Sequence, residues 1–266
     1  MAWRPSRFLR WAIALHPLAA ATYLFVPASG PGLLTGLLSL HAGIALIGLW
    51  PRSTLLGDNL VRLPARAVAR REVALTFDDG PDPLVTPQVL AILRQYQARA
   101  TFFCIGSRAQ ACPALCRQIV AEGHEIENHG QRHHPLTPAS GLAGWRREIG
   151  EAQQTLSRIT GRLPAFYRPM AGLRNPLLDP VLQQSGLRLA CWTRRGFDTR
   201  VKDPEQVYAK LARDLSAGAI LLLHDGNAAT GPRGRPVVLD VLPRLLDDVA
   251  ARQLVTVTLQ QACKTD

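Results

Sequence analysis

The chain has 266 residues, which is enough for one large α/β domain and an appendage. Its formal net charge of +11 comes almost entirely from arginine and would suit acidic partners such as phospholipid headgroups, lipid-linked phosphates or nucleic acid. The arginines are scattered, no zinc-finger or RNA-recognition signature is present, and aromatic residues make up only 6% of the chain, so we expect no nucleic-acid partner.

Two apolar runs lie near the N-terminus, from Trp11 to Val26 and from Leu33 to Trp50, with a short uncharged turn between them. Each is close to the lower limit of about 17–25 residues for a helix that spans a bilayer. A cleaved signal peptide would account for the first run but not for the second. We therefore predict a membrane-anchoring segment of two apolar helices over residues 1–52 and a linker over residues 53–70.

Arginines flank both outer ends of this hairpin, and none lies in the turn. Because cytoplasmic flanks are enriched in arginine and lysine, both ends are predicted to lie on the cytoplasmic face of the inner (cell) membrane. The alternative follows from the shortness of the runs and from His16. The first segment would then lie on the membrane surface, the second would cross alone, and the rest of the chain would lie outside.

Short β-prone runs alternate with helix-like segments over residues 71–260. The predicted strands are Val73–Phe77, Ala100–Ile105, His124–Glu127, Ala165–Tyr167, Leu187–Trp192, Ala219–Leu223 and Leu254–Leu259. The predicted helices are Thr86–Gln97, Pro113–Glu122, Leu142–Ile159, Pro176–Gln184, Pro204–Leu215 and Leu239–Ala251. This alternation predicts a parallel sheet covered by helices, either a seven-stranded barrel or a doubly wound sheet.

Polar residues follow several of these strands. Asp78 and Asp79 follow the first strand, and His129 and His133 follow the third. The polar residues after the fourth, fifth and sixth strands are Arg168, Asp198, His224 and Asp225. In parallel α/β folds function gathers at the carboxyl ends of the strands, so we expect these groups to meet on one rim.

The stretch VALTFDDGP ends in two adjacent carboxylates, Asp78 and Asp79, although like charges in one place cost free energy. A turn is one explanation, because Asp, Gly and Pro are common turn residues, and a bound cation is the other. His129 and His133 are spaced i, i+4, so on a helical turn both imidazoles would face one metal. A plain polar loop is the alternative here, and His134 is a weaker candidate ligand.

Asp79, His129 and His133 together would give a two-histidine, one-aspartate set with an open position, which is the pattern of catalytic zinc sites. Asp78 would remain free beside the metal. The metal charge would keep Asp78 ionised and able to take a proton from water.

Five cysteines are present, in an odd number and without the regular spacing of a disulfide framework. They are Cys104, Cys112, Cys116, Cys191 and Cys263. This pattern argues against a disulfide-stapled secreted domain, and we assign the cysteines no role.

The motifs TFDDGP, HGQRH, RPMAG and LLLHDG occur in this order, and with them residues 71–260 resemble the NodB-type polysaccharide deacetylases of carbohydrate esterase family 4. The resemblance implies a distorted seven-stranded (β/α) barrel, the NodB homology domain. It also implies hydrolytic removal of N- or O-acetyl groups from sugars such as N-acetylglucosamine. The implied cofactor is a divalent metal, Zn²⁺ in the first place and Co²⁺ or Mn²⁺ otherwise.

The resemblance also implies a role for each matching residue. Asp78 matches the general base, and Arg168 matches an arginine that pairs with this base. The residues that match the metal ligands are Asp79, His129 and His133.

The remaining matches concern the leaving group and the substrate. His224 matches the general acid that protonates the leaving amine, and Asp198 matches the aspartate that orients it. Leu222 matches a leucine of the acetyl-methyl pocket, and we place Trp192 and Ala171 in the substrate site as well. A backbone N–H near Ala171 would help the metal hold the oxyanion.

Three departures from the family pattern concern substrate choice. Gly130 replaces a Ser or Thr, RPMAG lacks an aromatic that the family usually has, and Arg195 and Thr199 replace an Asp and a Trp. The arginines expected in the groove are Arg174, Arg194, Arg195 and Arg200. Such a groove would suit a sugar that carries phosphate, because arginine binds phosphate through two parallel hydrogen bonds.

The sequence therefore predicts a membrane-attached, metal-dependent hydrolase that removes N-acetyl groups from an acetylated amino-sugar polymer. Two alternatives remain open. One is a deformylase or deacetylase that acts on a lipid-linked sugar phosphate, and the other is a non-catalytic carbohydrate-binding membrane protein.

Overall fold

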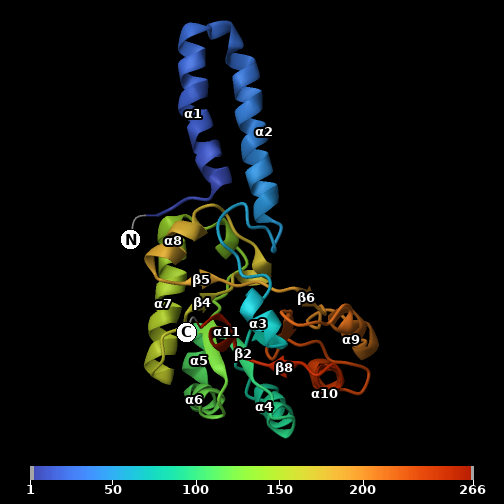
Figure 1. Ribbon diagram of the computed structural model, residues 1–266. Coiled ribbons are helices and arrows are strands. Elements are labelled where there is room, and N and C mark those ends of the chain that lie inside the picture. The colour runs from blue at the N-terminus through green and yellow to red at the C-terminus, as the bar shows by residue number, and fades with distance from the viewer. Residues whose placement is uncertain (1–2, 265–266) are drawn as a thin grey trace.

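The computed structural model describes residues 3–264 and contains a helical hairpin that projects from an α/β domain (Figure 1). The hairpin consists of α1 (Arg7–Phe25), the short 3₁₀ helix η1 (Pro27–Ser29) and α2 (Gly30–Gly48). Both long helices are apolar and long enough to cross a membrane, and almost none of their surface is buried inside the protein. Length and composition fit a membrane hairpin, and they also fit a signal sequence at this end of the chain.

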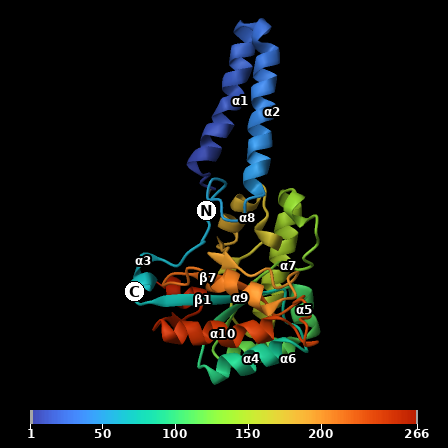
Figure 2. The same cartoon turned by 90° about the vertical axis from the view of Figure 1, so that its right-hand side faces the viewer.

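The hairpin is joined closely to the domain at the end of α2. Gly48 accepts a hydrogen bond from the Arg174 N–H at 3.1 Å, and a Cβ atom on Gly48 would lie 2.2 Å from the Arg174 carbonyl oxygen. Only glycine allows this approach of two backbones. Trp3 donates from its indole N–H to Asp179 of α8 (Leu178–Gln184) at 2.8 Å. The helix α8 lies just below the hairpin (Figure 2).

Residues 53–70, which we predicted to be a linker, pack against the domain. Leu56 is fully buried, and the short helix α3 (Ala65–Ala69) buries Ala67. Leu60 donates to the Leu189 carbonyl at 2.9 Å and accepts from the Cys191 N–H at 3.0 Å. This segment therefore adds backbone pairing to one part of the sheet.

The predicted α/β barrel-type fold is confirmed: the domain is built on a curled parallel sheet that forms a half-barrel. The strands are β1 (Glu72–Asp78), β2 (Ala100–Cys104), β3 (Glu125–Asn128), β4 (Phe166–Tyr167), β5 (Arg188–Leu189), β6 (Arg194–Arg195), β7 (Ile220–His224) and β8 (Val255–Thr256). Seven of them follow the order β5-β4-β3-β2-β1-β7-β6, and β8 pairs with the start of β1. Every strand pair is parallel.

The predicted strand Leu187–Trp192 contains β5 alone in the structure, and β6, which lies just beyond it, was not predicted. The Ala190 N–H donates to Tyr167 of β4 at 3.0 Å, and the Thr193 N–H donates to Ile220 of β7 at 2.8 Å. The short segment from β5 to β6 thus runs from one edge of the curled sheet, beside β4, to the other edge, beside β7. The sequence could not show this, because each strand has only two residues and no recognisable period.

Helices pack around the sheet. They are α4 (Thr86–Gln95), α5 (Gly106–Ala111), α6 (Pro113–Ala121), α7 (Leu142–Thr160), α8 (Leu178–Gln184), α9 (Pro204–Ala212), α10 (Val238–Ala251) and α11 (Leu259–Cys263), with 3₁₀ turns η2 (Thr137–Ala139) and η3 (Met170–Gly172). The short helix α11 packs on the inner side of the sheet, because its Leu259 and Ala262 share a hydrophobic core with Ala74 of β1. Each of the six predicted helices has a counterpart, whereas α3, α5 and α11 were not predicted; these three have only five or six residues each. A helix so short adds little periodic signal to the sequence.

Three hydrophobic cores are present among the described residues, and strand alternation separates the first two. On β1, Leu75 and Phe77 point to the large core under α4 and α10, whereas Ala74 belongs to a smaller core on the inner side of the sheet. On β7, Leu221 and Leu222 divide in the same way. Because successive side chains of a strand point to opposite faces, residues an even number of positions from Ala74 or Leu222 lie on the inner face of the sheet. The candidate site lies on this face.

Candidate active site

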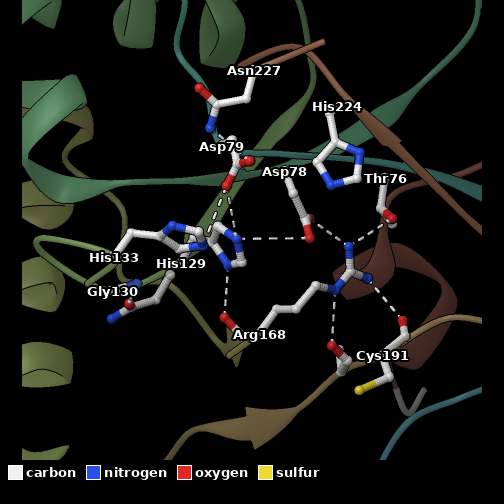
Figure 3. Close-up of polar contacts among 12 residues, drawn as sticks. Thr76, Asp78, Asp79, His129, Gly130, His133, Arg168, Cys191, His224 and Asn227 are labelled. Atoms are coloured by element: carbon white, nitrogen blue, oxygen red, sulfur yellow. Dashed lines mark hydrogen bonds and ion pairs between the residues drawn. The ribbon is translucent and has the colours of Figure 1, made fainter. Parts of the chain in front are cut away.

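A pocket of about 340 Å³ opens at the carboxyl ends of the strands on the inner side of the sheet. The sequence-predicted residues that line it are Asp78, Asp79, His129, His133, Ala171, Trp192, Leu222 and His224. Arg168 and Asp198, which are fully buried, lie behind this lining and contact Asp78 and His224. The structure therefore brings all ten predicted site residues together (Figure 3 shows most of them).

Strand register places the predicted base and acid side by side. Asp78 is the last residue of β1, His224 is the last residue of β7, and the two are register partners in adjacent parallel strands. Neighbouring strands lie about 4.8 Å apart, so both side chains enter the pocket from the same face.

Arg168 holds the Asp78 carboxylate in place through hydrogen bonds. Its Nη1 donates to Asp78 Oδ1 at 2.6 Å and to the Thr76 hydroxyl at 2.8 Å. The other donors bond the carbonyls of Ala190 and Cys191 at 3.0 and 2.8 Å (Figure 3). A charged group this deep in the protein needs such complete pairing, because an unpaired buried charge is strongly destabilising.

Asp79, His129 and His133 converge on one point. The Nε2 atoms of both histidines lie 3.3 Å from Asp79 Oδ1, and the three ligand atoms lie within 4.8 Å of one another (Figure 3). Among the described residues, Asp79 Oδ1 and His133 Nε2 are buried without a hydrogen-bond partner. Buried polar atoms are rarely left without partners, so two of them aimed at one point fit a cation between them.

The protonation of these groups also suits a metal. His129 Nδ1 lies 2.7 Å from the Arg168 carbonyl oxygen, which can only accept, so Nδ1 carries the proton and Nε2 is the free nitrogen. Burial and the neighbouring His129 lower the pKa of His133 to about 4, which keeps this imidazole neutral at neutral pH. Burial opposes ionisation of Asp79, but contact with His129 and the charges of both histidines hold its pKa below the usual value.

The expected helical turn between the two histidines is absent. His129 to His133 form an irregular loop after β3, in which Gly130 (φ 85°) and His133 (φ 54°) have left-handed backbone angles. The i, i+4 spacing thus predicted that the two imidazoles converge, but not the backbone that brings them together. Two left-handed residues turn the chain back, and a helix would not contain them.

Glu148 of α7 supports this loop, a role that the sequence did not suggest. Its Oε1 accepts the N–H groups of Arg132 and His133, both at 2.8 Å. A Cβ atom on Gly130 would lie 2.7 Å from the same Oε1, so a larger residue would push Glu148 away. The glycine that departs from the family pattern therefore makes room for a carboxylate that binds the loop.

Asn227 and Arg108 fix Asp79 from the opposite side. The Asn227 amide donates to Asp79 Oδ2 at 2.9 Å, which leaves Oδ1 for the convergence point. Arg108 donates to the Asp79 carbonyl at 2.7 Å and to Asn227 Oδ1 at 2.8 Å. Neither residue is in a motif that we used, although Asn227 directly follows LLLHDG, which was the nearest signal in the sequence.

Asp198 orients His224. Its Oδ2 accepts the His224 backbone N–H at 2.7 Å, and its Oδ1 lies 2.8 Å from His224 Nδ1. Burial alone would lower the pKa of His224, but the Asp198 charge and hydrogen bond outweigh burial and raise it to about 9. His224 is therefore protonated at neutral pH.

The arginines that we expected in the groove divide into two groups. Arg195 and Arg200 line the pocket. Arg174 does not, and the prediction for it is wrong: it is buried, and its Nη2 donates to the Ser53 carbonyl at 2.6 Å. Arg194 pairs with Asp214 at 2.7 Å, outside the active-site pocket.

The chain is similar in sequence to known proteins. The polysaccharide deacetylase family profile matches residues 65–190. A peptidoglycan-N-acetylglucosamine deacetylase from Bacillus cereus is 36% identical over 156 residues, which cover 58% of this chain and 72% of that protein.

Solved structures show the same fold. The structure of a peptidoglycan N-acetylglucosamine deacetylase has a TM-score of 0.69 at 26% identity and covers 78% of this chain and 94% of its own. A pseudoenzyme of carbohydrate esterase family 4 from Bacillus anthracis has the same TM-score at 17% identity, with 78% and 69% covered. The fold alone thus occurs with and without activity, but with the sequence match it identifies the chain as a member of the polysaccharide deacetylase family.

Proposed function

We propose that this protein is a metal-dependent hydrolase that removes acetyl groups from an acetylated amino sugar. The observation that carries this function is the meeting of three units in one pocket. They are the convergent ligands around Asp79, the Arg168–Asp78 pair and the Asp198–His224 pair. Hydrolysis of an amide needs an activated water, a stabilised oxyanion and a proton for the amine, and these units match the three needs.

Asp79, His129 and His133 would hold the divalent cation, with Zn²⁺ as the first choice for two nitrogens and one carboxylate. When bound, such a cation polarises a carbonyl and increases the acidity of water. Asp78, held by Arg168, takes a proton from the attacking water. Its carboxylate faces the pocket beside His129, with 3.8 Å between Asp78 Oδ2 and His129 Nε2.

His224 delivers a proton to the leaving amine. Asp198 accepts from Nδ1, so the second proton of the imidazolium is on Nε2, the nitrogen left for the substrate. Leu222 and Trp192 give the pocket an apolar wall for the acetyl methyl, and Ala171 with its left-handed backbone (φ 50°) lies on the same lining. We assign these three residues to substrate binding.

The substrate class follows from the relatives, whose names give peptidoglycan N-acetylglucosamine as their substrate. An acetylated amino-sugar polymer and a lipid-linked amino sugar both present the same N-acetyl group. A non-catalytic, carbohydrate-binding role is less well supported here, because every group that the hydrolysis needs lies in one pocket.

To test this function, the full chain is purified in detergent and incubated with acetylated chito-oligomers and with acylated polyprenyl-phosphate amino sugars. The release of acetate or formate is measured. Chelation is expected to abolish release, and Zn²⁺ or Co²⁺ to restore it. Asp78→Asn should retain metal and lose about 10²–10⁴-fold in rate, because general base catalysis contributes that much.

Two outcomes would count against this proposal. Full activity in a metal-free preparation would exclude the metal role, and no release from either substrate would exclude the hydrolase. If Asp78→Asn empties the metal site and Asp79→Asn does not, the two aspartates have exchanged roles.

The loop contact of Glu148 gives a second prediction. Glu148→Ala removes the acceptor of the Arg132 and His133 N–H groups and is expected to weaken Zn²⁺ binding by about 10- to 100-fold, as loss of outer-shell support typically does. Glu148→Gln retains an acceptor oxygen and should bind more tightly than Glu148→Ala. Competition with a chelator measures the affinity, and Glu151→Ala on the same helix is the control; equal affinities for both alanine variants would exclude the role.

The Asp198–His224 pair gives a pH prediction. The acid must be protonated, so kcat/KM is expected to fall as the pH rises through the His224 pKa of about 9. Asp198→Asn still accepts a hydrogen bond but removes the charge that raises this pKa, so the alkaline limb should move to lower pH. A pH profile of both proteins checks this, and an unmoved limb would contradict the role of Asp198.

We also propose that the hairpin of residues 1–52 anchors the catalytic domain, residues 71–260, to the cell membrane on its cytoplasmic face. Two crossings return the chain to its starting side, and arginines flank both outer ends. An alkaline phosphatase fused to the C-terminus should then be inactive, while a fusion at Ser29, in the turn, should be active. Activity of the C-terminal fusion would place the domain outside.

A further inference from the structure

A second pocket, of about 470 Å³, lies between the end of α2 and the active site. Trp192 and Arg195 line both pockets, so the two are adjacent and share a wall. At its other end the second pocket is lined by Trp50, Pro51 and Arg52, which follow α2 directly. It therefore lies between the proposed metal centre and the base of the apolar hairpin.

The lining of this pocket is strongly cationic. Its charged residues are Arg52, Arg194, Arg195, Lys210 and Arg213, and no carboxylate of the described chain lines it. Asp214 neutralises only part of this charge, because it pairs with Arg194 at 2.7 Å and lies 3.8 Å from Arg213. Like charges this close repel one another, so an anion bound among them would be favourable.

Arg195 is the clearest sign of a missing partner. Its Nε is buried and has no hydrogen-bond partner among residues 3–264, although the charges of Asp78 and Asp198 act on its guanidinium. The guanidinium is instead held between rings, 4.3 Å from the Phe197 centroid and 5.2 Å from the Trp192 centroid. Stacking fixes the plane of the group and leaves its N–H donors for a ligand.

Arg52 adds a donor on the side of the hairpin. One of its nitrogens donates to the Thr193 carbonyl at 3.2 Å, which holds the side chain across the pocket and leaves further N–H groups unused. Trp50, two residues away, is largely exposed and follows the apolar helix, a position typical of tryptophan at a membrane surface. A ligand here would touch both the membrane surface and the active site.

We propose that this pocket binds the phosphate of a sugar phosphate while the acylated amino group of the same sugar reaches Asp78 and His224. The proposal rests on the deacetylase function and specifies its substrate class. Arginine fits phosphate through paired, charge-assisted hydrogen bonds, and several cations around one site suit a phosphodiester or diphosphate. A neutral glycan would leave the charges and the Arg195 Nε uncompensated.

Binding is tested first without catalysis. The metal is removed by chelation, so that phosphate cannot bind to it, and inorganic phosphate and diphosphate are titrated while tryptophan fluorescence is followed, because Trp50 and Trp192 line the pocket. Saturable binding is expected, weakened about tenfold or more in Arg52→Gln/Lys210→Gln and in Arg195→Gln, since charge-assisted hydrogen bonds are lost. Arg117→Gln, an exposed arginine on α6 outside the pocket, is the control and should bind as the unmodified protein does. Equal binding by all variants would overturn the proposal.

Kinetics then identify the source of the phosphate. The ratio of kcat/KM for a phosphate-bearing substrate to that for a neutral chito-oligomer is expected to fall about tenfold in Arg52→Gln/Lys210→Gln, through KM, and to stay constant in Arg117→Gln. N-acetylglucosamine 1-phosphate represents a soluble source of the phosphate, and polyprenyl-phosphate N-acetylglucosamine represents a membrane source. A higher kcat/KM for either compound than for the chito-oligomer supports the phosphate site. The compound with the higher kcat/KM identifies the source. Hydrolysis of the chito-oligomer with no preference for phosphate would overturn this inference and leave the deacetylase intact, whereas no hydrolysis of any substrate would overturn the function itself.

Discussion

The ion pair between Arg168 and Asp78 lies where several parts of the curled sheet meet. Arg168 follows β4, Asp78 ends β1, and the carbonyls of Ala190 and Cys191 belong to the segment between β5 and β6. The guanidinium also lies 3.9 Å above the Phe103 ring of β2. Removing one partner of such a buried pair typically costs about 3–5 kcal/mol of the free energy of unfolding, so the pair fixes the Asp78 carboxylate and the sheet together.

Other groups at the site are held in the same way, by chain segments that are distant in the sequence. Glu148 of α7 supports the histidine loop, Asn227 orients Asp79, and Asp198 orients His224. Each of these supporting groups binds a side-chain atom or a backbone N–H other than the atom at the convergence point or facing the substrate. The reactive atoms are therefore left with few partners inside the protein, which is the arrangement that a ligand-binding site needs.

Some of the contacts that join the hairpin to the α/β domain are made by charged side chains. Arg174, a residue that seemed suited to the groove, instead lies under the segment that leads from α2 into the sheet and binds the Ser53 carbonyl. Arg52 and Arg195 are different, because their donors face a pocket between the hairpin and the active site. The many arginines of this chain thus serve different purposes. Only the contacts of each side chain in the folded protein distinguish an arginine that supports the backbone from one that is available to a ligand.

The amino-acid sequence by itself determined the alternation of strands and helices, the two apolar helices and the motif residues at the strand ends. It could do so because strand period, apolar length and short motifs are local properties. Only the tertiary structure decided that β5 and β6 are separate, that His129 and His133 meet through a left-handed loop and that Glu148 and Asn227 support the convergence of these histidines with Asp79. These features depend on which residues become neighbours when the sheet curls, and a hydrogen bond between residues as far apart as Asp79 and Asn227 leaves no periodic trace along the chain.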